Sequence, residues 1–362
     1  MTTATVNERL ARLTELGTSI WLDQIQRSLI ESGELARMVR EDSLRGVTSN
    51  PAIFEKAILG SEDYNDVIAA AEGDARSIYQ EIAIADIQAA CDVLRPVWDA
   101  TDGYDGFVSF EVDPDLAHDS DKTIAQAREY WQRVDRPNLM IKIPGTDAGL
   151  GPIEEALYDG ININVTLLFA VSQYSKVMRA FIAAQTRRLD EGKPMNVHSV
   201  ASFFVSRVDT EVDKRLDELD VPALKGRAGL ANARAAYKRY LEVFKGDDFA
   251  RLRTAGCPVQ RPLWASTGTK NPDYSDILYV DGLAGPETVN TMPLATMKAA
   301  ADHSEVTTET LRIDPSEDLA ALAGAGIDLD DVTDKLLSDG IDAFVTPMKK
   351  LLEGIETKRS EV

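Results

Sequence analysis

Apolar stretches of strand length alternate with longer segments of helical periodicity along most of the chain. Eight stretches are typical of strands, namely Ser19–Asp23, Gly46–Pro51, Gly106–Val112, Asn138–Pro144, Ile161–Leu168, His198–Phe204, Arg261–Ser266 and Ile277–Asp281. Helical periodicity fills most of the intervals, at about residues 28–41, 63–98, 120–133, 170–191, 205–245 and 315–354. Because strands that alternate with helices form parallel sheets, eight such units predict a closed (β/α)8 TIM barrel.

The chain has 362 residues, a length that allows one large domain or two. A doubly wound open sheet is the competing architecture, but no Gly-x-Gly-x-x-Gly or P-loop motif follows the first predicted strand. No linker-like break divides the chain, so we expect a single barrel domain over residues 1–362. Extra helices are expected at the N-terminus, after the sixth strand and at the C-terminus, where they could cover a site or form an interface.

Polar residues fall on one face of several predicted strands. Side chains alternate between the two faces of a strand, so Ser109 and Glu111 share a face opposite Val108 and Phe110. The same alternation groups Trp21 with Asp23, Met140 with Lys142, Asn164 with Thr166, and Ser202 with Phe204. The helix-facing side of a barrel strand must be apolar, so these polar residues are predicted to point inward, mostly near the strand ends where barrel active sites lie.

Lys142 is the least ordinary of these residues, because it interrupts an apolar strand between Ile141 and Ile143. An unpaired buried ammonium is costly, which favours a functional role. Desolvation lowers the pKa of a lysine and makes its neutral amine available for a Schiff base with a carbonyl. Two carboxylates, Asp23 and Glu111, could transfer protons at that amine, although each alone could equally be a cap or an ion pair.

Charge and composition narrow the possible partners. With 39 Lys and Arg against 60 Asp and Glu, the net charge of −21 argues against nucleic acid or an anionic membrane. The histidines and cysteines are isolated and form no metal motif: His118, His198, His303, Cys91 and Cys257. The opening MTTATVNERLARL has no apolar core of the signal-peptide type, and no run approaches the roughly 18 apolar residues of a membrane span. We therefore expect a cytoplasmic protein without a metal.

Five motifs in order along the chain resemble the transaldolase family: Val47–Pro51 (VTSNP), Ile141–Pro144 (IKIP), Gly160–Phe169 (GININVTLLF), Ser202–Asp209 (SFFVSRVD) and Trp264–Ser266 (WAS). The resemblance runs from about Trp21 to Asp281. It implies cofactor-free transfer of a dihydroxyacetone unit in the pentose phosphate pathway. The donor is sedoheptulose 7-phosphate and the acceptor glyceraldehyde 3-phosphate, giving erythrose 4-phosphate and fructose 6-phosphate.

The resemblance also implies a role for each polar residue of the strands. Lys142 matches the Schiff-base lysine, and Asp23 matches the acid that deprotonates the donor hydroxyl during carbon–carbon cleavage. Glu111 matches a carboxylate that acts through a water, and Thr166 matches the hydroxyl that positions this water. The residues that line the dihydroxyacetone pocket are then Asn50, Asn164, Ser202 and Phe204. Taken alone, Asn164, Thr166 and Ser202 could instead be buried hydrogen-bonding residues.

Cations for the distal phosphate are expected at the ends of the sixth and seventh strands. Arg207 matches the phosphate-binding arginine of the family, although it could also form a surface ion pair with Asp209 or Glu211. Where a second arginine is expected, this chain has Ser266 followed by Thr-Gly-Thr and Lys270. Lys270 offers a point charge without the bidentate fork of arginine, and we expect Ser266 and Lys270 to bind substrate there.

The sequence is also compatible with two other functions. A related class I aldolase would split fructose 6-phosphate through the same imine, but such relatives are much shorter, and Glu111 and Phe204 follow the transaldolase pattern. A non-catalytic barrel could bind sugar phosphates, but it would not need Lys142, Asp23 and Glu111 together. We expect sugar-phosphate substrates, no nucleic acid or membrane partner, no cofactor, and a monomer or homodimer.

Overall fold

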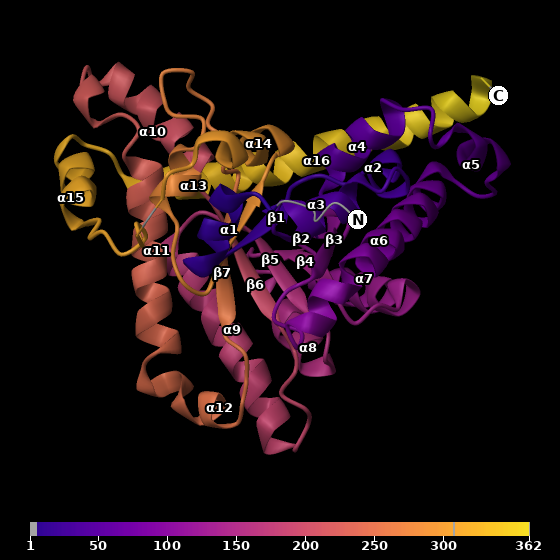
Figure 1. Cartoon of the computed structure of the whole chain (residues 1–362), viewed down its shortest axis with the longest axis horizontal. Coiled ribbons are helices and arrows are strands. Elements are labelled where there is room, and N and C mark those ends of the chain that lie inside the picture. The colour runs from indigo at the N-terminus through magenta and orange to yellow at the C-terminus, as the bar shows by residue number, and fades with distance from the viewer. Residues whose placement is uncertain (1–5, 307, 362) are drawn as a thin grey trace.

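The computed structural model describes residues 6–306 and 308–361. Its centre is a closed barrel of eight parallel strands in sequence order, with the last strand paired to the first (Figure 1). The strands are β1 (Thr18–Leu22), β2 (Leu44–Thr48), β3 (Phe107–Glu111), β4 (Leu139–Pro144), β5 (Ile163–Leu168), β6 (Ser199–Phe204), β7 (Gln260–Ala265) and β8 (Thr288–Met292). The predicted (β/α)8 fold class is confirmed.

Helices surround the barrel and also extend beyond it at the three predicted places. They are α1 (Glu8–Glu15), α2 (Arg27–Glu31), α3 (Glu34–Glu41), α4 (Pro51–Leu59), α5 (Asn65–Ala70), α6 (Ala75–Ala100), α7 (Ser120–Val134), α8 (Leu150–Asp159), α9 (Val171–Asp190), α10 (Ser206–Glu218), α11 (Ala228–Phe244), α12 (Ala250–Thr254), α13 (Leu278–Gly282), α14 (Leu294–His303), α15 (Ser316–Gly324) and α16 (Leu329–Glu361). Three single turns are 3-10 helices: Pro114–Leu116, Pro222–Leu224 and Asp247–Phe249. Across the described residues, none of these helices is long and apolar enough to cross a membrane.

The position predicted for the eighth strand is wrong. The apolar stretch Ile277–Asp281 largely forms helix α13, where the buried Tyr279 donates a hydrogen bond from its hydroxyl to Asp209 at 2.7 Å. The true eighth strand, Thr288–Met292, escaped prediction because three of its five residues are polar. Thr288 and Thr291 lie within hydrogen-bond distance of threonines on β1 and β2, so these polar side chains are satisfied inside the barrel.

The second strand also ends earlier than predicted, at Thr48. Pro51 does not extend the strand but is the first residue of α4, a position where its missing N–H costs no hydrogen bond. Asn50 caps this helix, because its side-chain oxygen accepts a hydrogen bond from the backbone N–H of Ile53 at 3.0 Å. The motif VTSNP is therefore a strand end, a cap and a helix start.

The barrel strands divide their side chains between two hydrophobic clusters. The cluster in the barrel interior includes Trp21, Phe107, Met140, Val200 and Leu263. The alternate residues of the same strands belong to the larger cluster under the helices, including Ile20, Val108, Ile141, Ala201 and Trp264. This division follows the predicted parity, and it places the polar residues of the strands on the interior face.

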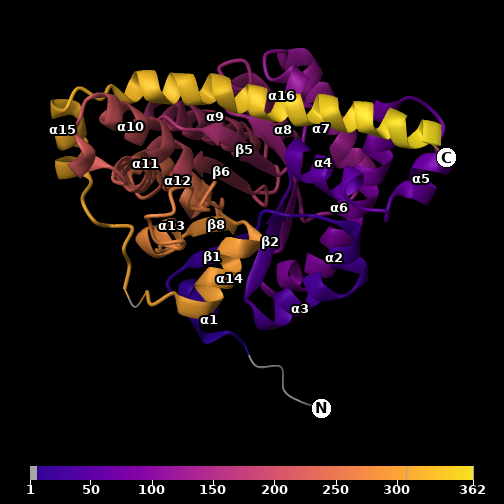
Figure 2. The ribbon, with the colours of Figure 1, turned by 90° about the horizontal axis from the view of Figure 1, so that it is seen from above.

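The C-terminal helix α16 is the longest element, with 33 residues. Figure 2 shows it running across the molecule from α15 to the side of α4 and α5. It contacts α4, α6, α10 and the barrel strand β5. The extra helix at the C-terminus therefore covers one end of the barrel.

Candidate active site

Lys142 lies in the barrel interior, near the C-terminal end of β4, with 5% of its side chain exposed. The strand register places it directly beside Glu111 on β3. Its Nζ lies 3.2 Å from Glu111 Oε2 and donates a hydrogen bond to the backbone carbonyl of Ser49, also at 3.2 Å. Sequence parity and register thus bring the expected lysine and one expected carboxylate together in a buried ion pair.

Glu111 is an incompletely satisfied carboxylate. Burial raises its pKa to about 7, because the charged form loses water, while the Lys142 ammonium opposes this rise. Apart from the ion pair with Lys142, neither of its oxygens has a hydrogen-bond partner among the described residues, and the same is true of the hydroxyl of Thr166 on β5. A carboxyl group that titrates near neutral pH suits proton transfer in both directions.

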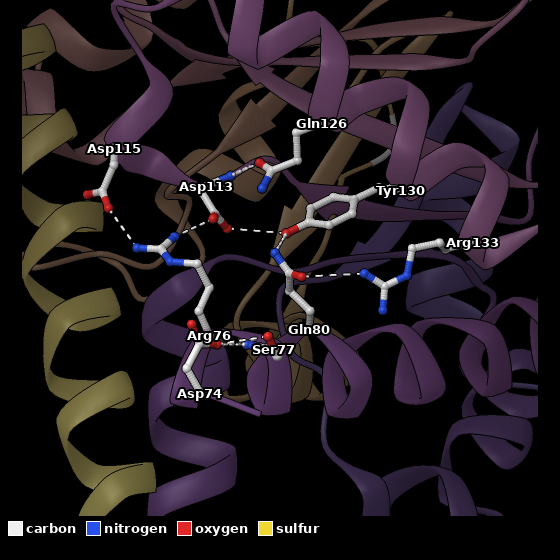
Figure 3. A network of polar contacts seen from close by, with 9 residues as sticks. All are labelled: Asp74, Arg76, Ser77, Gln80, Asp113, Asp115, Gln126, Tyr130 and Arg133. Carbon is white, nitrogen blue, oxygen red and sulfur yellow. Dashed lines mark hydrogen bonds and ion pairs between the residues drawn. The ribbon is translucent and has the colours of Figure 1, made fainter. Parts of the chain in front are cut away.

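The loop that follows β3 is held by a polar network. Asp113, two residues after Glu111, forms an ion pair with Arg76 and accepts a hydrogen bond from the hydroxyl of Tyr130 at 3.2 Å (Figure 3). Its backbone N–H donates to Gln126 Oε1 at 2.7 Å. These contacts join the end of β3 to α6 and α7, so the backbone next to Glu111 is fixed.

Asp23 directly follows β1 and faces the same space. Its Oδ1 accepts a hydrogen bond from the hydroxyl of Thr48 at 2.6 Å. Burial raises the pKa of Asp23, while the nearby charges of Lys142, Lys270 and Arg207 lower it. Sequence analysis did not single out Thr48, although it lies within the VTSNP motif and its parity could have placed it inside the barrel.

Asn164 connects three neighbouring elements of the pocket. Its Nδ2 donates to Ser109 Oγ on β3 at 2.9 Å, and its Oδ1 accepts from Ser202 Oγ on β6 at 2.6 Å. The register places Asn164 beside Lys142. The three polar side chains are fully buried, so this amide is held in a fixed orientation next to the lysine.

Phe204 ends the sixth strand, and Arg207 lies next to it in the first turn of α10. The ring centroid of Phe204 lies 5.2 Å from that of Phe169 and 5.4 Å from the guanidinium carbon of Arg207. Burial lowers the pKa of Arg207. The alternative ion pair with Asp209 or Glu211 is absent, and within the described ranges no hydrogen bond or ion pair is made by this guanidinium.

The remaining predicted residues lie at the edge of this group. Asn50 is half-buried, and its side-chain oxygen accepts the capping hydrogen bond of α4. Ser266 has a left-handed backbone with φ of 55° and its Oγ lies 2.9 Å from Ser206 Oγ. Lys270 is exposed and lines a cavity of about 430 Å³ beside Asp213 on α10. Lys270 is therefore the most exposed of the predicted site residues.

One aromatic side chain that sequence analysis missed covers the site. Phe344 of α16 is 4% exposed, and its ring centroid lies 5.5 Å from Lys142 Nζ. A cavity of about 530 Å³ lies between α16 and the loops after β4 and β5. Leu167 and Phe169 line it, whereas Lys142 does not. No signal in the sequence could have shown that a helix so distant along the chain reaches the lysine.

Comparison with known proteins places similar sequences in one enzyme family. Residues 20–355 match the family model described as transaldolase/fructose-6-phosphate aldolase. The chain is 46% identical to a transaldolase of Mycolicibacterium smegmatis over 97% of each chain. It is 47% identical to a transaldolase of Mycobacterium marinum over 98% of each chain, and 48% identical to one of Mycobacterium tuberculosis over 96% of each.

Proposed function

Because the chain belongs to the transaldolase/fructose-6-phosphate aldolase family, we propose that it is a transaldolase that works through a Schiff base on Lys142. It transfers a dihydroxyacetone unit from sedoheptulose 7-phosphate to glyceraldehyde 3-phosphate, giving erythrose 4-phosphate and fructose 6-phosphate. The observation that carries the proposal is the buried pair of Lys142 and Glu111 at 3.2 Å, inside the end of the barrel.

The first step joins the donor to the enzyme. The neutral amine of Lys142 attacks the C2 carbonyl of the donor, and the resulting carbinolamine loses water to form the protonated imine. Glu111 supplies the proton for the departing hydroxyl and takes it back on hydrolysis, a role that suits a pKa of about 7. Thr166 has an unpaired buried hydroxyl that can orient the water involved.

The second step breaks the carbon chain. Asp23 removes the proton from the C4 hydroxyl, the C3–C4 bond breaks, and its electron pair flows into the protonated imine to form an enamine. Erythrose 4-phosphate leaves as the aldehyde. Addition of glyceraldehyde 3-phosphate reverses these events and forms fructose 6-phosphate after hydrolysis. The hydrogen bond from Thr48 orients one oxygen of Asp23 and leaves the other for the substrate.

The enamine must persist until the acceptor arrives. Asn50, Asn164 and Ser202 suit this task, because neutral groups orient the hydroxyls of the bound unit without placing another charge beside the imine. Arg207, which has no anionic partner among the described residues, is placed to bind the distal phosphate, and Lys270 adds a second positive charge at the rim. Such local cations offset the repulsion expected from a net charge of −21.

Borohydride reduction tests the central assignment. We expect fructose 6-phosphate and borohydride to give a stable adduct on Lys142, identified by peptide mass mapping. The exposed Lys122→Ala variant should be trapped equally well. An adduct on another lysine, or no adduct, would overturn the assignment of Lys142.

The alternative within the family is a fructose 6-phosphate aldolase that releases free dihydroxyacetone. The relatives named transaldolase cover nearly the whole chain, which favours transfer. We expect fructose 6-phosphate to be consumed quickly only when erythrose 4-phosphate is present, with sedoheptulose 7-phosphate as a product. Release of dihydroxyacetone at the same rate without an acceptor would overturn the transferase function.

We also infer a single catalytic domain in a cytoplasmic protein that is a monomer or homodimer. The pairing of β1 with β8 supports one domain, because it joins segments from the two halves of the chain. Cys91 and Cys257 are both buried free thiols, as expected in a reducing compartment. Light scattering coupled to size-exclusion chromatography tests the assembly state, and a mass above that of a dimer would contradict it.

A further inference from the structure

We propose that Phe344 shields the nitrogen of Lys142 from water, so that its ring determines whether the bound dihydroxyacetone unit is transferred or lost by hydrolysis. The inference rests on the proposed function, since it concerns the covalent intermediate on Lys142. It gives the long C-terminal helix α16 a specific part in the reaction: its aromatic side chain forms the roof of the reaction chamber.

The first support for this role is the environment of the ring. Phe344 belongs to the hydrophobic cluster of the barrel interior, together with Trp21 and Phe204. Met348, one turn further along α16, belongs instead to the cluster under the surrounding helices. Val332 and Leu336 of α16 belong to the same cluster as Phe344, whereas Met348 packs under the surrounding helices.

The second support is the close approach of α16 to the site, one turn before Phe344. A Cβ atom added to Gly340 would lie 3.0 Å from Leu167 Cδ2, 3.5 Å from Phe169 Cε2 and 3.7 Å from Arg207 Nη1. Glycine thus lets the helix backbone rest on the end of β5 and on the guanidinium. Gly340 therefore lies close to the predicted phosphate-binding arginine, and Phe344, one turn later, lies over Lys142.

The chemistry explains why a phenyl ring suits this position. The imine nitrogen carries a positive charge, and an aromatic ring within about 6 Å stabilises a cation without donating a proton. Loss of the bound unit requires protonation of the enamine carbon, then attack of water on the imine carbon, which releases dihydroxyacetone and the free amine of Lys142. An apolar cover slows both events because it keeps water from the intermediate.

A cavity lies against α16 beside the turn that precedes Phe344. The cavity of about 530 Å³ is lined by Ile341 and Leu337 of α16 and by Leu167 and Phe169. The last two residues also border Gly340, so the cavity reaches the turn of α16 that precedes Phe344. Phe344 does not line the cavity and instead faces Lys142. Truncation of the ring would therefore open a path for water toward the lysine.

The test compares Phe344→Ala with wild type, with fructose 6-phosphate as the donor. The measured quantity is the ratio of two rates: release of free dihydroxyacetone without acceptor, and transfer to erythrose 4-phosphate. We expect Phe344→Ala to raise this ratio by roughly tenfold. Phe344→Leu keeps an apolar cover without the aromatic face, so its ratio should lie closer to wild type, while its transfer kcat falls.

Met348→Ala is the matched control, because it removes a buried side chain from the same helix outside the chamber. It should lower thermal stability and leave the ratio of release to transfer unchanged. An equal rise of the ratio in Met348→Ala would show that general loosening of α16 is the cause and would overturn the inference.

The two proposals can fail separately. If borohydride traps the wild-type adduct on Lys142 but folded Phe344→Ala keeps the wild-type ratio, the role of Phe344 is overturned and the proposed function stands. If wild type forms no adduct with any lysine, the proposed function fails, and the inference about Phe344 fails with it.

Discussion

The two ends of the barrel interior each contain a buried ion pair with the same separation. Near the C-terminal ends of the strands, Lys142 and Glu111 lie 3.2 Å apart, with 5% and 3% of their side chains exposed. At the opposite end, Arg261 and Asp105 also lie 3.2 Å apart, with 4% and 6% exposed. Distance and burial therefore do not distinguish the two pairs, and the difference between them lies in their neighbours.

The pair at the N-terminal end is fully satisfied. Asp105 accepts hydrogen bonds from the hydroxyl of Ser19 and from Trp21 Nε1, in addition to Arg261. Arg261 also donates to Ser19 Oγ at 2.8 Å and to the backbone carbonyl of Tyr104 at 2.9 Å. A buried pair with this many partners fixes the ends of β1, β3 and β7.

The pair of Lys142 and Glu111 at the C-terminal end has fewer partners, and we call it the open pair. Apart from the ion pair with Lys142, the carboxylate oxygens of Glu111 have no hydrogen-bond partner among the residues that the structure describes, and the same is true of the Thr166 hydroxyl. Unmet polar groups beside a buried lysine are costly for stability and useful for chemistry. The two pairs therefore differ in the hydrogen bonds around them and not in their burial, and the pair with fewer partners is the one to which we assign the chemistry.

The sharpest test of this comparison is Lys142→Ala. We expect turnover to fall by at least roughly 10⁴-fold, because the nucleophile is lost. The variant should still fold, since Glu111, whose pKa is already about 7, can become neutral when the ammonium is removed. Transaldolase assays and circular dichroism check the two expectations. Substantial residual turnover would mean that another group forms the imine.

Arg261→Met breaks the pair of Arg261 and Asp105 at the N-terminal end of the barrel, which we call the closed pair because its groups have more partners. It leaves Asp105 buried without its cation, so we expect a loss of about 3–5 kcal/mol in the free energy of unfolding. The turnover of the folded fraction should be unchanged, because Arg261 lies at the end of the barrel away from Lys142. Urea denaturation and activity per folded molecule measure these effects. A stable variant with low activity would contradict the assignment of a purely structural role.

These two pairs also show what the sequence could predict. The inward direction of Lys142, Glu111 and Asp23 was predictable, because strand alternation fixes the face of each side chain. The Arg261–Asp105 pair was not, because Asp105 lies in the loop before β3 and meets Arg261 only when the barrel closes. Local periodicity therefore predicts residues on strands, whereas contacts made by loops depend on the assembled fold.

The misplaced eighth strand has a similar physical origin. The apolar composition of Ile277–Asp281 is typical of a strand. In the structure most of it is helical, and the buried Tyr279 donates a hydrogen bond to Asp209. Phe344 could not be assigned either, since periodicity predicts the helix near the C-terminus and not its path across the barrel. Both failures concern long-range packing, which a single sequence does not encode in its local pattern.

Glu111→Gln tests the open pair without removing the lysine. We expect kcat to fall by roughly 10²–10³, because glutamine keeps the shape of the side chain but cannot transfer a proton. Borohydride trapping on Lys142 should become slower, since formation of the imine needs this proton. Steady-state assays and trapping time courses measure the two effects. An unchanged kcat would remove Glu111 from the proton transfer.

Arg207→Ala tests the predicted phosphate-binding arginine at the same end of the barrel. We expect KM for phosphorylated donors to rise by roughly 10- to 100-fold with little change in kcat, because the charge-assisted contact to phosphate is lost. Arg207→Lys should recover part of this loss as a point charge. Arg251→Ala, an exposed arginine on α12, is the control and should leave KM unchanged. An unchanged KM in Arg207→Ala would exclude Arg207 from the phosphate site.

The smallest expected effect is a dependence of stability on pH that belongs to the open pair. The pKa of Glu111 is about 7 in the folded protein and near 4.5 for an ordinary glutamate. Between these values the folded state keeps a proton that the unfolded state has released, so the contribution of Glu111 to stability falls as pH rises. The difference in unfolding free energy between wild type and Glu111→Gln should therefore decline across this window and level off above it. Denaturant titrations of both proteins at several pH values measure this difference, which also cancels groups common to both, such as Asp209. A difference that stays constant across the window would mean that Glu111 is ionised throughout, and that the open pair is no more reactive than the closed one.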